Sequence, residues 1–309
     1  MSSLRIVSGS ANPRLAESIA DALDVTSEAS AVERFPDGEL RPRVEHVGGH
    51  DVYVVQPTAP PANDSLMELL LLLDACRRAR ARRVTAVVPY LGYVRQDRRT
   101  HTGESLGARL VCEAIAQAGA ERLVVVDPHT PTLEAMSPIP VETLSAVPLL
   151  ASRLTAGRTD RTVVVAPDLG AGPLAERYAA ALGTSVAIVR KFRQSGTEVS
   201  AVELIGDIEG RPTVIVDDMI ATGATIEAAL RILHYHARDV VVAATHGPLL
   251  PAATERLRAL GLRRVLVTDT VAHRDSAAPL DVCSVGPLLA DAIARLHQDR
   301  PLAELAAHR

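Results

Sequence analysis

The sequence predicts an α/β protein with two tandem domains, each a mainly parallel sheet covered by helices. Short apolar segments alternate with amphipathic segments of helical spacing, which is the pattern of parallel sheets buried on both faces. Of the 309 residues, 47% are hydrophobic, which is enough for a substantial core. The strand segments are too numerous for one comfortable sheet, so we expect one domain at 1–147 and a second at 148–309.

The predicted elements each have a local signal. Asn12-Pro13 begins a helix whose apolar face carries Leu15 and Ile19, and residues 63–65 can cap the next helix. Further helices are predicted at about 105–118 and at 288–296, and the latter is a terminal helix that could pack back on the first domain. Short apolar runs predict strands at 4–7, 52–56, 84–88, 123–126, 162–165, 186–189, 213–216, 240–243 and 265–267.

Composition argues against several classes of partner. The net charge of −4 gives no reason to expect binding to nucleic acid or to an anionic membrane. No apolar run reaches the ~18 residues of a membrane span, and the N-terminal residues lack the pattern of a signal peptide. Cys76, Cys112 and Cys283 are widely spaced in apolar surroundings, as expected for buried thiols in a reducing compartment. We therefore expect a cytoplasmic protein.

The stretch 213–226 carries the clearest chemical signal. Its predicted strand runs into Asp217 and Asp218, and small residues at 221–225 then lead into a helix predicted to begin near Ile226. Such a turn directs backbone N–H groups at one point, and the helix N-terminus adds partial positive charge. The turn therefore suits a phosphate, and the acids suit sugar hydroxyls or a metal-bound diphosphate. An ordinary strand-to-helix turn with two acids is the alternative.

Lys191 is the only lysine among the 33 basic residues of the chain. An ammonium is a compact point charge, whereas the guanidinium used everywhere else is a planar fork, so this position favours a function. Lys191 and Arg193 follow a predicted strand and precede a polar stretch that reaches about Ser200. A mobile loop with two cations could close over the charge that develops in phosphoryl-type transfer. A solvated loop is the alternative.

Three further segments contain candidate binding residues. Residues 35–39 place a phenylalanine ring beside two carboxylates, which suits a purine but also fits an acidic β-turn. Three arginines within 95–99 can grip triphosphate oxygens, or can form a solvated basic turn. His129 lies just beyond a strand that ends at Asp127 and could bind Mg²⁺ or its water, although magnesium prefers oxygen ligands and a lone histidine is more often structural.

Together these segments resemble the ribose-phosphate pyrophosphokinase family, the phosphoribosyl diphosphate (PRPP) synthetases, over nearly the whole chain. The turn that follows Asp217 resembles the PRPP loop that this family shares with type I phosphoribosyltransferases. The other matching motifs are SGSANP at 8–13, FPDGE at 35–39, NDSLMELL at 63–70, PYLGYVRQDRR at 89–99, VDPH at 126–129, APDLG at 166–170, IGDIEGR at 205–211 and ATHG at 244–247. The resemblance implies two phosphoribosyltransferase-like domains.

The resemblance also implies an activity, which is transfer of the diphosphoryl group of ATP to the C1 hydroxyl of ribose 5-phosphate, giving PRPP and AMP. It implies Mg²⁺ as cofactor and a homo-oligomer, a dimer or hexamer, with the active site near a subunit interface. The residues that it implicates are Lys191 and Arg193 in catalysis, Phe35, Asp37, Glu39, Arg95, Gln96, Asp97 and Arg98 in ATP binding, Asp217, Asp218, Ala221, Thr222, Gly223, Ala224 and Thr225 in ribose 5-phosphate binding, and His129 and Asp168 in metal binding.

The sequence departs from the family pattern at several positions. Ala221 stands where an acid is common in the family, which leaves open a variant enzyme for another sugar phosphate. In the segment 100–105 the usual arginine is absent and Glu104 adds a negative charge, so we expect weak allosteric inhibition by ADP. A catalytically silent regulatory subunit should have lost the catalytic cations, which are present here, and a phosphoribosyltransferase should lack the ATP-binding motifs.

Overall fold

The computed structural model describes residues 3–155, 161–195, 198–233, 237–273 and 280–306. The chain divides into two compact units. Unit 1 comprises residues 1–145, 270–272 and 284–309, and unit 2 comprises 146–269 and 273–283. The last helix therefore belongs to unit 1, although the chain passes through unit 2 before it forms.

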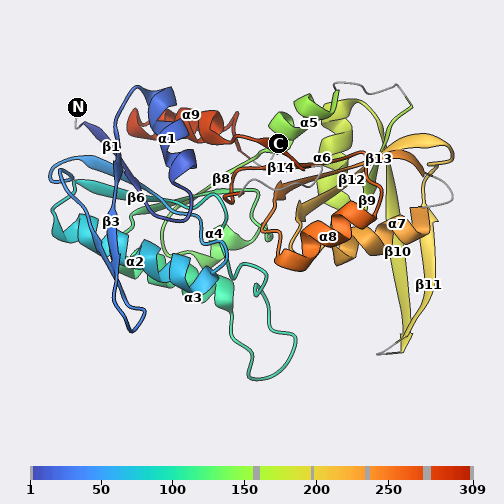
Figure 1. Cartoon of the computed structure of the whole chain (residues 1–309), viewed down its shortest axis with the longest axis horizontal. Helices are drawn as coiled ribbons and strands as arrows, with labels where there is room; N and C mark the ends of the chain where they lie inside the picture. Colours follow the sequence, from blue (N-terminus) through green and yellow to red (C-terminus); the bar gives the residue numbers. More distant parts are fainter. Residues whose placement is uncertain (1–2, 156–160, 196–197, 234–236, 274–279, 307–309) are drawn as a thin grey trace. The chain divides into compact units, whose positions relative to one another are not determined.

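Unit 1 is built on a six-stranded parallel sheet in the order β2-β1-β5-β6-β7-β8. These strands are β1 Leu4–Ser8, β2 Ser27–Ala29, β5 Asp51–Val55, β6 Arg83–Val87, β7 Arg122–Val126 and β8 Val141–Leu144. Helices α1 (Pro13–Leu23) and α9 (Gly286–His297) cover one face, and α2 (Ala62–Arg78) and α3 (Gly107–Ala118) cover the other (Figure 1). The short helix α4 (Leu133–Met136) follows β7, and β3 (Ala31–Arg34) pairs with β4 (Leu40–Arg43) in a separate hairpin.

Unit 2 has a seven-stranded sheet in the order β11-β10-β9-β12-β13-β14-β15, parallel except for the β10–β11 pair. Its strands are β9 Val163–Ala166, β10 Ser185–Ser195, β11 Glu198–Ile205, β12 Arg211–Met219, β13 Ala237–His246, β14 Arg264–Thr268 and β15 Leu280–Cys283. Helices α5 (Val147–Thr155) and α6 (Gly172–Leu182) lie on one face, and α7 (Ala224–Leu233) and α8 (Pro251–Ala259) lie on the other (Figure 1).

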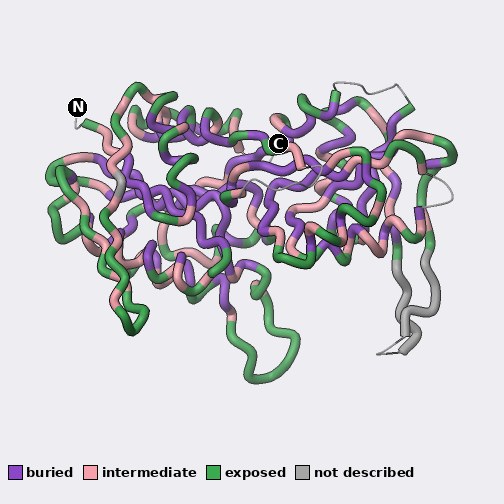
Figure 2. Tube along the Cα trace, in the orientation of Figure 1, coloured by how far each residue is buried: buried purple, intermediate pink, exposed green. Residues whose placement is uncertain are grey.

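Burial follows the sheets, as Figure 2 shows by the purple that runs along the central strands. Every residue of β5 is buried, because helices cover this strand on both faces. On α2, Leu69, Leu72 and Leu73 recur at helical spacing and join Val54 of β5 in one apolar cluster. Burial of each such leucine contributes about 1.5–3 kcal/mol, so this helix face holds α2 against the unit 1 sheet.

The predicted α/β class is confirmed, and each predicted strand coincides with an observed strand. Asn12 caps α1 as predicted, since its side chain accepts a hydrogen bond from the Leu15 backbone N–H at 3.3 Å. The three cysteines are buried and free, also as predicted. None of the helices in the described part of the chain is both long and apolar enough to span a lipid bilayer.

Three local predictions are wrong. The cap predicted at 63–65 lies inside α2, which begins at Ala62 after Pro61 with no side-chain cap. Helix α7 begins at Ala224, before the predicted start near Ile226. Where the structure describes it, the polar stretch after Val189 is not an irregular loop, because β10 continues to Ser195 and pairs with β11, which begins at Glu198.

Candidate active site

Three carboxylates meet at one edge of the unit 2 sheet. Strands β9 and β12 are adjacent and parallel, so their carboxyl ends share an edge, where ligands bind in open α/β sheets. Asp168 closely follows β9, and Asp217 and Asp218 lie near the end of β12. One Asp168 oxygen accepts the backbone N–H of Ala171 at 3.1 Å, and Asp217 Oδ1 accepts that of Asp218 at 2.9 Å.

One carboxyl group of this acidic cluster, that of Asp217, has a strongly raised pKa. Burial, and next the neighbouring Asp218 carboxylate, raise the pKa of Asp217 to about 8, with a smaller contribution from Asp168. Close carboxylates oppose each other's ionisation, so Asp217 holds its proton to a higher pH than an ordinary aspartate does. A bound cation or a hydroxyl donor would favour full ionisation. An acid with a pKa shifted this far, at a strand edge, indicates a candidate functional site.

The turn between β12 and α7 offers backbone donors beside these acids. It is held at its base because Ile220 N–H donates to the His246 carbonyl and Leu250 N–H donates to the Ala221 carbonyl, each at 2.9 Å. Gly223 has φ of +73°, a left-handed conformation that glycine adopts without strain. Because the first N–H groups of a helix have no acceptor within it, the start of α7 can donate to an anion.

The two candidate catalytic cations belong to a strand that passes the same edge. Strand β10 runs parallel to β9 as far as the Ile188–Ala166 pair, then continues beyond it and pairs with β11. Lys191 and Arg193 lie on this extension. Their side chains fall outside the described residues, so only the backbone register is established.

In unit 1 the 35–39 segment is the tight turn of the β3–β4 hairpin. Gly38 N–H donates to the Phe35 carbonyl at 2.9 Å, and Phe35 N–H donates to the Glu39 carbonyl at 2.8 Å. The Arg41 guanidinium carbon lies 5.1 Å from the centroid of the half-buried Phe35 ring, a cation–π contact. Asp37 and Glu39 are exposed. The turn is therefore a β-turn that also presents an aromatic ring and two acceptors, so the two interpretations are compatible.

The 95–99 segment presents its arginines to solvent. Arg95, Arg98 and Arg99 are exposed, and within the described ranges no carboxylate forms an ion pair with them. Gln96 ties the segment to the start of α3, because its carbonyl accepts the Ala108 N–H at 3.2 Å. A Cβ on Gly107 would lie 2.7 Å from Gln96 Oε1, so the Gln96 side chain packs closely against the start of α3. Asp97 is half-buried.

The predicted metal ligands lie in separate units. His129 is exposed after β7 in unit 1, and Asp168 belongs to unit 2. Where the structure describes the chain, no three His, Cys, Asp or Glu side chains are grouped as a metal cage. Magnesium commonly keeps several waters and binds through one or two carboxylates and substrate phosphates, so Asp168 can contribute to a magnesium site without a cage of protein ligands.

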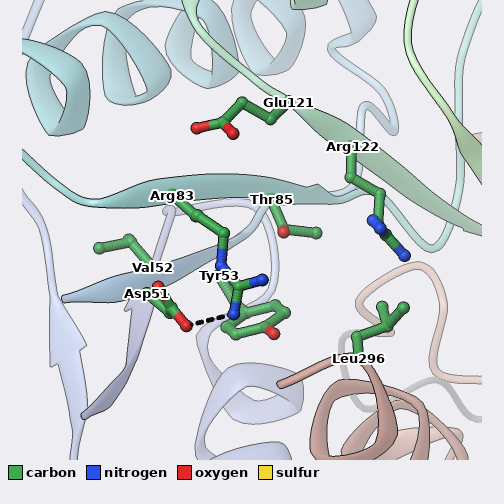
Figure 3. Close-up of a pocket in the computed structure, with 8 residues that line it drawn as sticks. All are labelled: Asp51, Val52, Tyr53, Arg83, Thr85, Glu121, Arg122 and Leu296. Atoms are coloured by element: carbon green, nitrogen blue, oxygen red, sulfur yellow. Dashed lines mark hydrogen bonds and ion pairs between the residues drawn. The ribbon is translucent and has the colours of Figure 1, made fainter. Parts of the chain in front are cut away.

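The sequence did not predict a pocket of about 110 Å³ at the opposite, amino end of the unit 1 strands (Figure 3). Arg83, at the start of β6, forms an ion pair at 2.5 Å with the buried Asp51 carboxylate of β5, and Leu296 of α9 forms an apolar wall. Arg122 is paired with Glu142 at 2.7 Å. Since both arginines are neutralised, we interpret this pocket as part of the attachment of α9 to the sheet.

The fold and the acidic edge define a class, the proteins built from two phosphoribosyltransferase-like domains. Residues 4–119 match the family model described as the N-terminal domain of ribose phosphate pyrophosphokinase, and residues 144–246 match the phosphoribosyl transferase domain. The ribose-phosphate pyrophosphokinase of Gloeobacter violaceus is 42% identical over 98% of this chain and 92% of its own length. That of Nostoc sp. is 41% identical over 98% of this chain and 93% of its own length.

A solved structure gives the same result. The crystal structure of phosphoribosylpyrophosphate synthetase from Mycobacterium smegmatis superposes with a TM-score of 0.90 and 36% identity, covering 96% of this chain and 99% of that chain. The chain therefore belongs to the ribose-phosphate pyrophosphokinase family.

Proposed function

We propose that the chain is a ribose-phosphate diphosphokinase, which transfers the diphosphoryl group of ATP to the C1 hydroxyl of ribose 5-phosphate and yields PRPP and AMP. The observation that carries the proposal is the cluster of Asp168, Asp217 and Asp218 beside the helix-start turn, in a chain whose two halves both match the family. Relatives that align over almost the full length favour this enzyme over a single-domain phosphoribosyltransferase.

The substrates would divide between the two units. In unit 2, Asp217 and Asp218 would bind the ribose hydroxyls, while the turn 221–225 donates N–H groups to the 5-phosphate. In unit 1, the exposed arginines of 95–99 would grip the ATP phosphates, and the 35–39 turn would hold adenine. One face of the Phe35 ring is covered by Arg41, so adenine would stack on the other face.

In the proposed reaction, the C1 hydroxyl oxygen of ribose 5-phosphate attacks the β-phosphorus of ATP. The bond from that phosphorus to the bridging α,β-oxygen breaks, AMP departs with the bond's electrons, and the hydroxyl proton is released. Lys191 and Arg193, on the extension of β10, would stabilise the charge that develops on the transferring group. Mg²⁺, when bound, supplies charge neutralisation on the phosphate oxygens. In unit 2, Asp168 would contribute a carboxylate ligand to it, and His129 of unit 1 is the other residue that the family resemblance implicates in metal binding.

Location and assembly complete the proposal. The free, buried thiols fit a reducing cytoplasm. A homo-oligomer, a dimer or hexamer, with the active site near a subunit interface is proposed from the family membership.

The proposed activity predicts AMP formation that depends on the sugar. With ATP, Mg²⁺ and ribose 5-phosphate we expect AMP and PRPP in equal amounts, measured by chromatography, and negligible AMP when the sugar is omitted. AMP formation only with a different sugar phosphate would indicate the variant enzyme that Ala221 leaves open. Absence of AMP with every sugar phosphate tested would identify a silent subunit.

The exposed segment 100–105 predicts weak allosteric control by ADP. The Glu104 carboxylate accepts the backbone N–H groups of Thr100 and His101 at 2.7 and 2.9 Å, and these bonds lower the pKa of Glu104. Two donors that an anion would need are thus occupied by a negative charge. We expect ADP to compete with ATP only, and activity without added phosphate. Initial rates against ADP at saturating ATP, with phosphate raised from zero, test this. Strong non-competitive inhibition or an absolute phosphate requirement would contradict it.

A further inference from the structure

Arg256 of α8 contacts the turn between β12 and α7 from behind. Its Nη1 donates a hydrogen bond of 2.6 Å to the Thr222 carbonyl, and its Nε lies 3.0 Å from Glu227 Oε2 in the first turn of α7. One guanidinium therefore joins α8 both to the turn and to the helix that follows it. Helices α7 and α8 lie side by side on the same face of the unit 2 sheet (Figure 1). Charge-assisted hydrogen bonds of this kind are stronger than neutral ones.

The hydrogen bond to Thr222 sets the direction of a backbone donor. In a trans peptide the carbonyl and the following N–H point in opposite directions. Because the Thr222 carbonyl is directed at Arg256, the Gly223 N–H is directed away from α8. The hydrogen bond from Arg256 to the Thr222 carbonyl therefore determines the direction in which the Gly223 N–H can donate a hydrogen bond.

The packing behind the turn makes α8 a firm support. A Cβ built on Gly223 would lie 3.6 Å from the Cδ of Arg256 and 3.6 Å from a methyl carbon of Leu257. Leu257 is only 1% exposed and belongs to the apolar core of unit 2. The turn thus rests on α8 through both the stem of Arg256 and a core side chain.

Arg256 also neutralises the carboxylate of Glu227, whose negative charge would oppose a bound phosphate. Glu227 lies in the first turn of α7, where a carboxylate competes with a bound phosphate for the positive end of the helix. Its two oxygens are paired, one with Arg256 and the other with Arg231 at 2.7 Å. The Arg231 side chain is 77% exposed against 35% for Arg256, so Arg256 is the less screened of the two cations.

We propose that Arg256 is a positioning residue for the 5-phosphate of ribose 5-phosphate. It orients the Thr222–Gly223 peptide towards the phosphate and neutralises Glu227, without touching the reacting atoms. This inference rests on the proposed assignment of residues 221–225 to the phosphate. It does not involve the ATP-binding segments.

Arg256→Met, which retains an apolar stem and removes the guanidinium, tests the proposal. We expect the KM for ribose 5-phosphate to rise about 10-fold or more, the order of loss for a hydrogen bond to a charged group. The KM for ATP should stay within two-fold and kcat within a few-fold. Calorimetry should show the same weakening of ribose 5-phosphate binding. Arg256→Lys should recover part of the affinity, because an ammonium can still donate to one acceptor.

Arg231→Met is the matched control, since it removes the other cation on Glu227 without changing the contact to Thr222. We expect it to leave both KM values within about two-fold, as is usual for an exposed ion pair. An equal rise in the KM for ribose 5-phosphate in the two variants would overturn the positioning role. So would equal losses for both substrates in Arg256→Met together with a lower unfolding temperature, because that pattern indicates a general structural defect.

Gly223→Ala tests the assignment of residues 221–225 to the phosphate separately from the positioning role of Arg256. A side chain at φ of +73° is strained, so the turn should distort and weaken ribose 5-phosphate binding if it holds the phosphate. If Gly223→Ala raises that KM and Arg256→Met does not, the positioning role is wrong and the site assignment stands. If neither variant affects ribose 5-phosphate, the assignment of 221–225 fails as well.

Discussion

Replacement of Lys191 by alanine is expected to lower kcat about 100-fold or more and to leave ATP affinity nearly unchanged. Removal of one preorganised donor aimed at developing charge typically costs this much, because the interaction exists mainly in the transition state. Lys191 lies on the extension of β10 past the edge that carries Asp168. Steady-state kcat and KM for both substrates, with ATP binding measured by calorimetry, would separate catalysis from binding.

Arg190→Ala is a suitable control for this prediction. Arg190 is the neighbouring cation on the same strand, β10. Arg190 also has an acid nearby, with Glu203 at 3.9 Å. We expect only a small change in kcat for this variant. If Lys191→Ala itself stays within a few-fold of the wild type, or if both variants lose activity equally, Lys191 has no special part in the reaction.

The sequence predicts the sheets well because the signals that form them are local. Segments such as Val52–Val55 and Val163–Val165 are continuous apolar runs, and only a strand covered on both faces buries such a run completely. The acidic cluster was predictable for a similar reason, since Asp168, Asp217 and Asp218 come at the ends of strands. The carboxyl ends of parallel strands share one edge, so sequence position alone brings these residues together.

The errors have physical causes that lie outside the local sequence. Asn63 has the chemistry of a helix cap, but α2 starts earlier, at Ala62, directly after Pro61. The polar stretch after Val189 resembled a loop because its local sequence carries no strong strand signal. It forms a strand by pairing with β11, and that pairing is not visible in the local sequence. Nothing in the sequence indicates that Arg256 contacts the turn, because this residue is one arginine among many. Its contact with Thr222 also joins residues that are far apart in the chain.

Replacement of Asp217 by asparagine is expected to reduce kcat/KM for ribose 5-phosphate by about 10- to 100-fold, while ATP binding changes little. A hydrogen bond to a charged group contributes about 1.5–3 kcal/mol, and asparagine removes the charge while preserving the shape. Asp218→Asn should act in the same direction. Asp281→Asn, which removes a carboxylate outside the proposed site, is the control. Equal losses for both substrates would instead indicate a folding defect.

The stability of the same variant should depend on pH in a definite direction. Burial and Asp218 raise the Asp217 pKa from 3.8 to about 8, so between these values the folded protein keeps a proton that the unfolded chain has lost. The contribution of Asp217 to stability is therefore fully present below about pH 4 and is lost as the pH rises through 8. Asparagine cannot ionise, so Asp217→Asn should unfold at a higher temperature than the wild type at pH 8.5, and the difference should shrink towards pH 5. Thermal unfolding without substrates at the two pH values measures this. A variant that is less stable than the wild type at pH 8.5 would show that the Asp217 carboxylate is not held against its own ionisation.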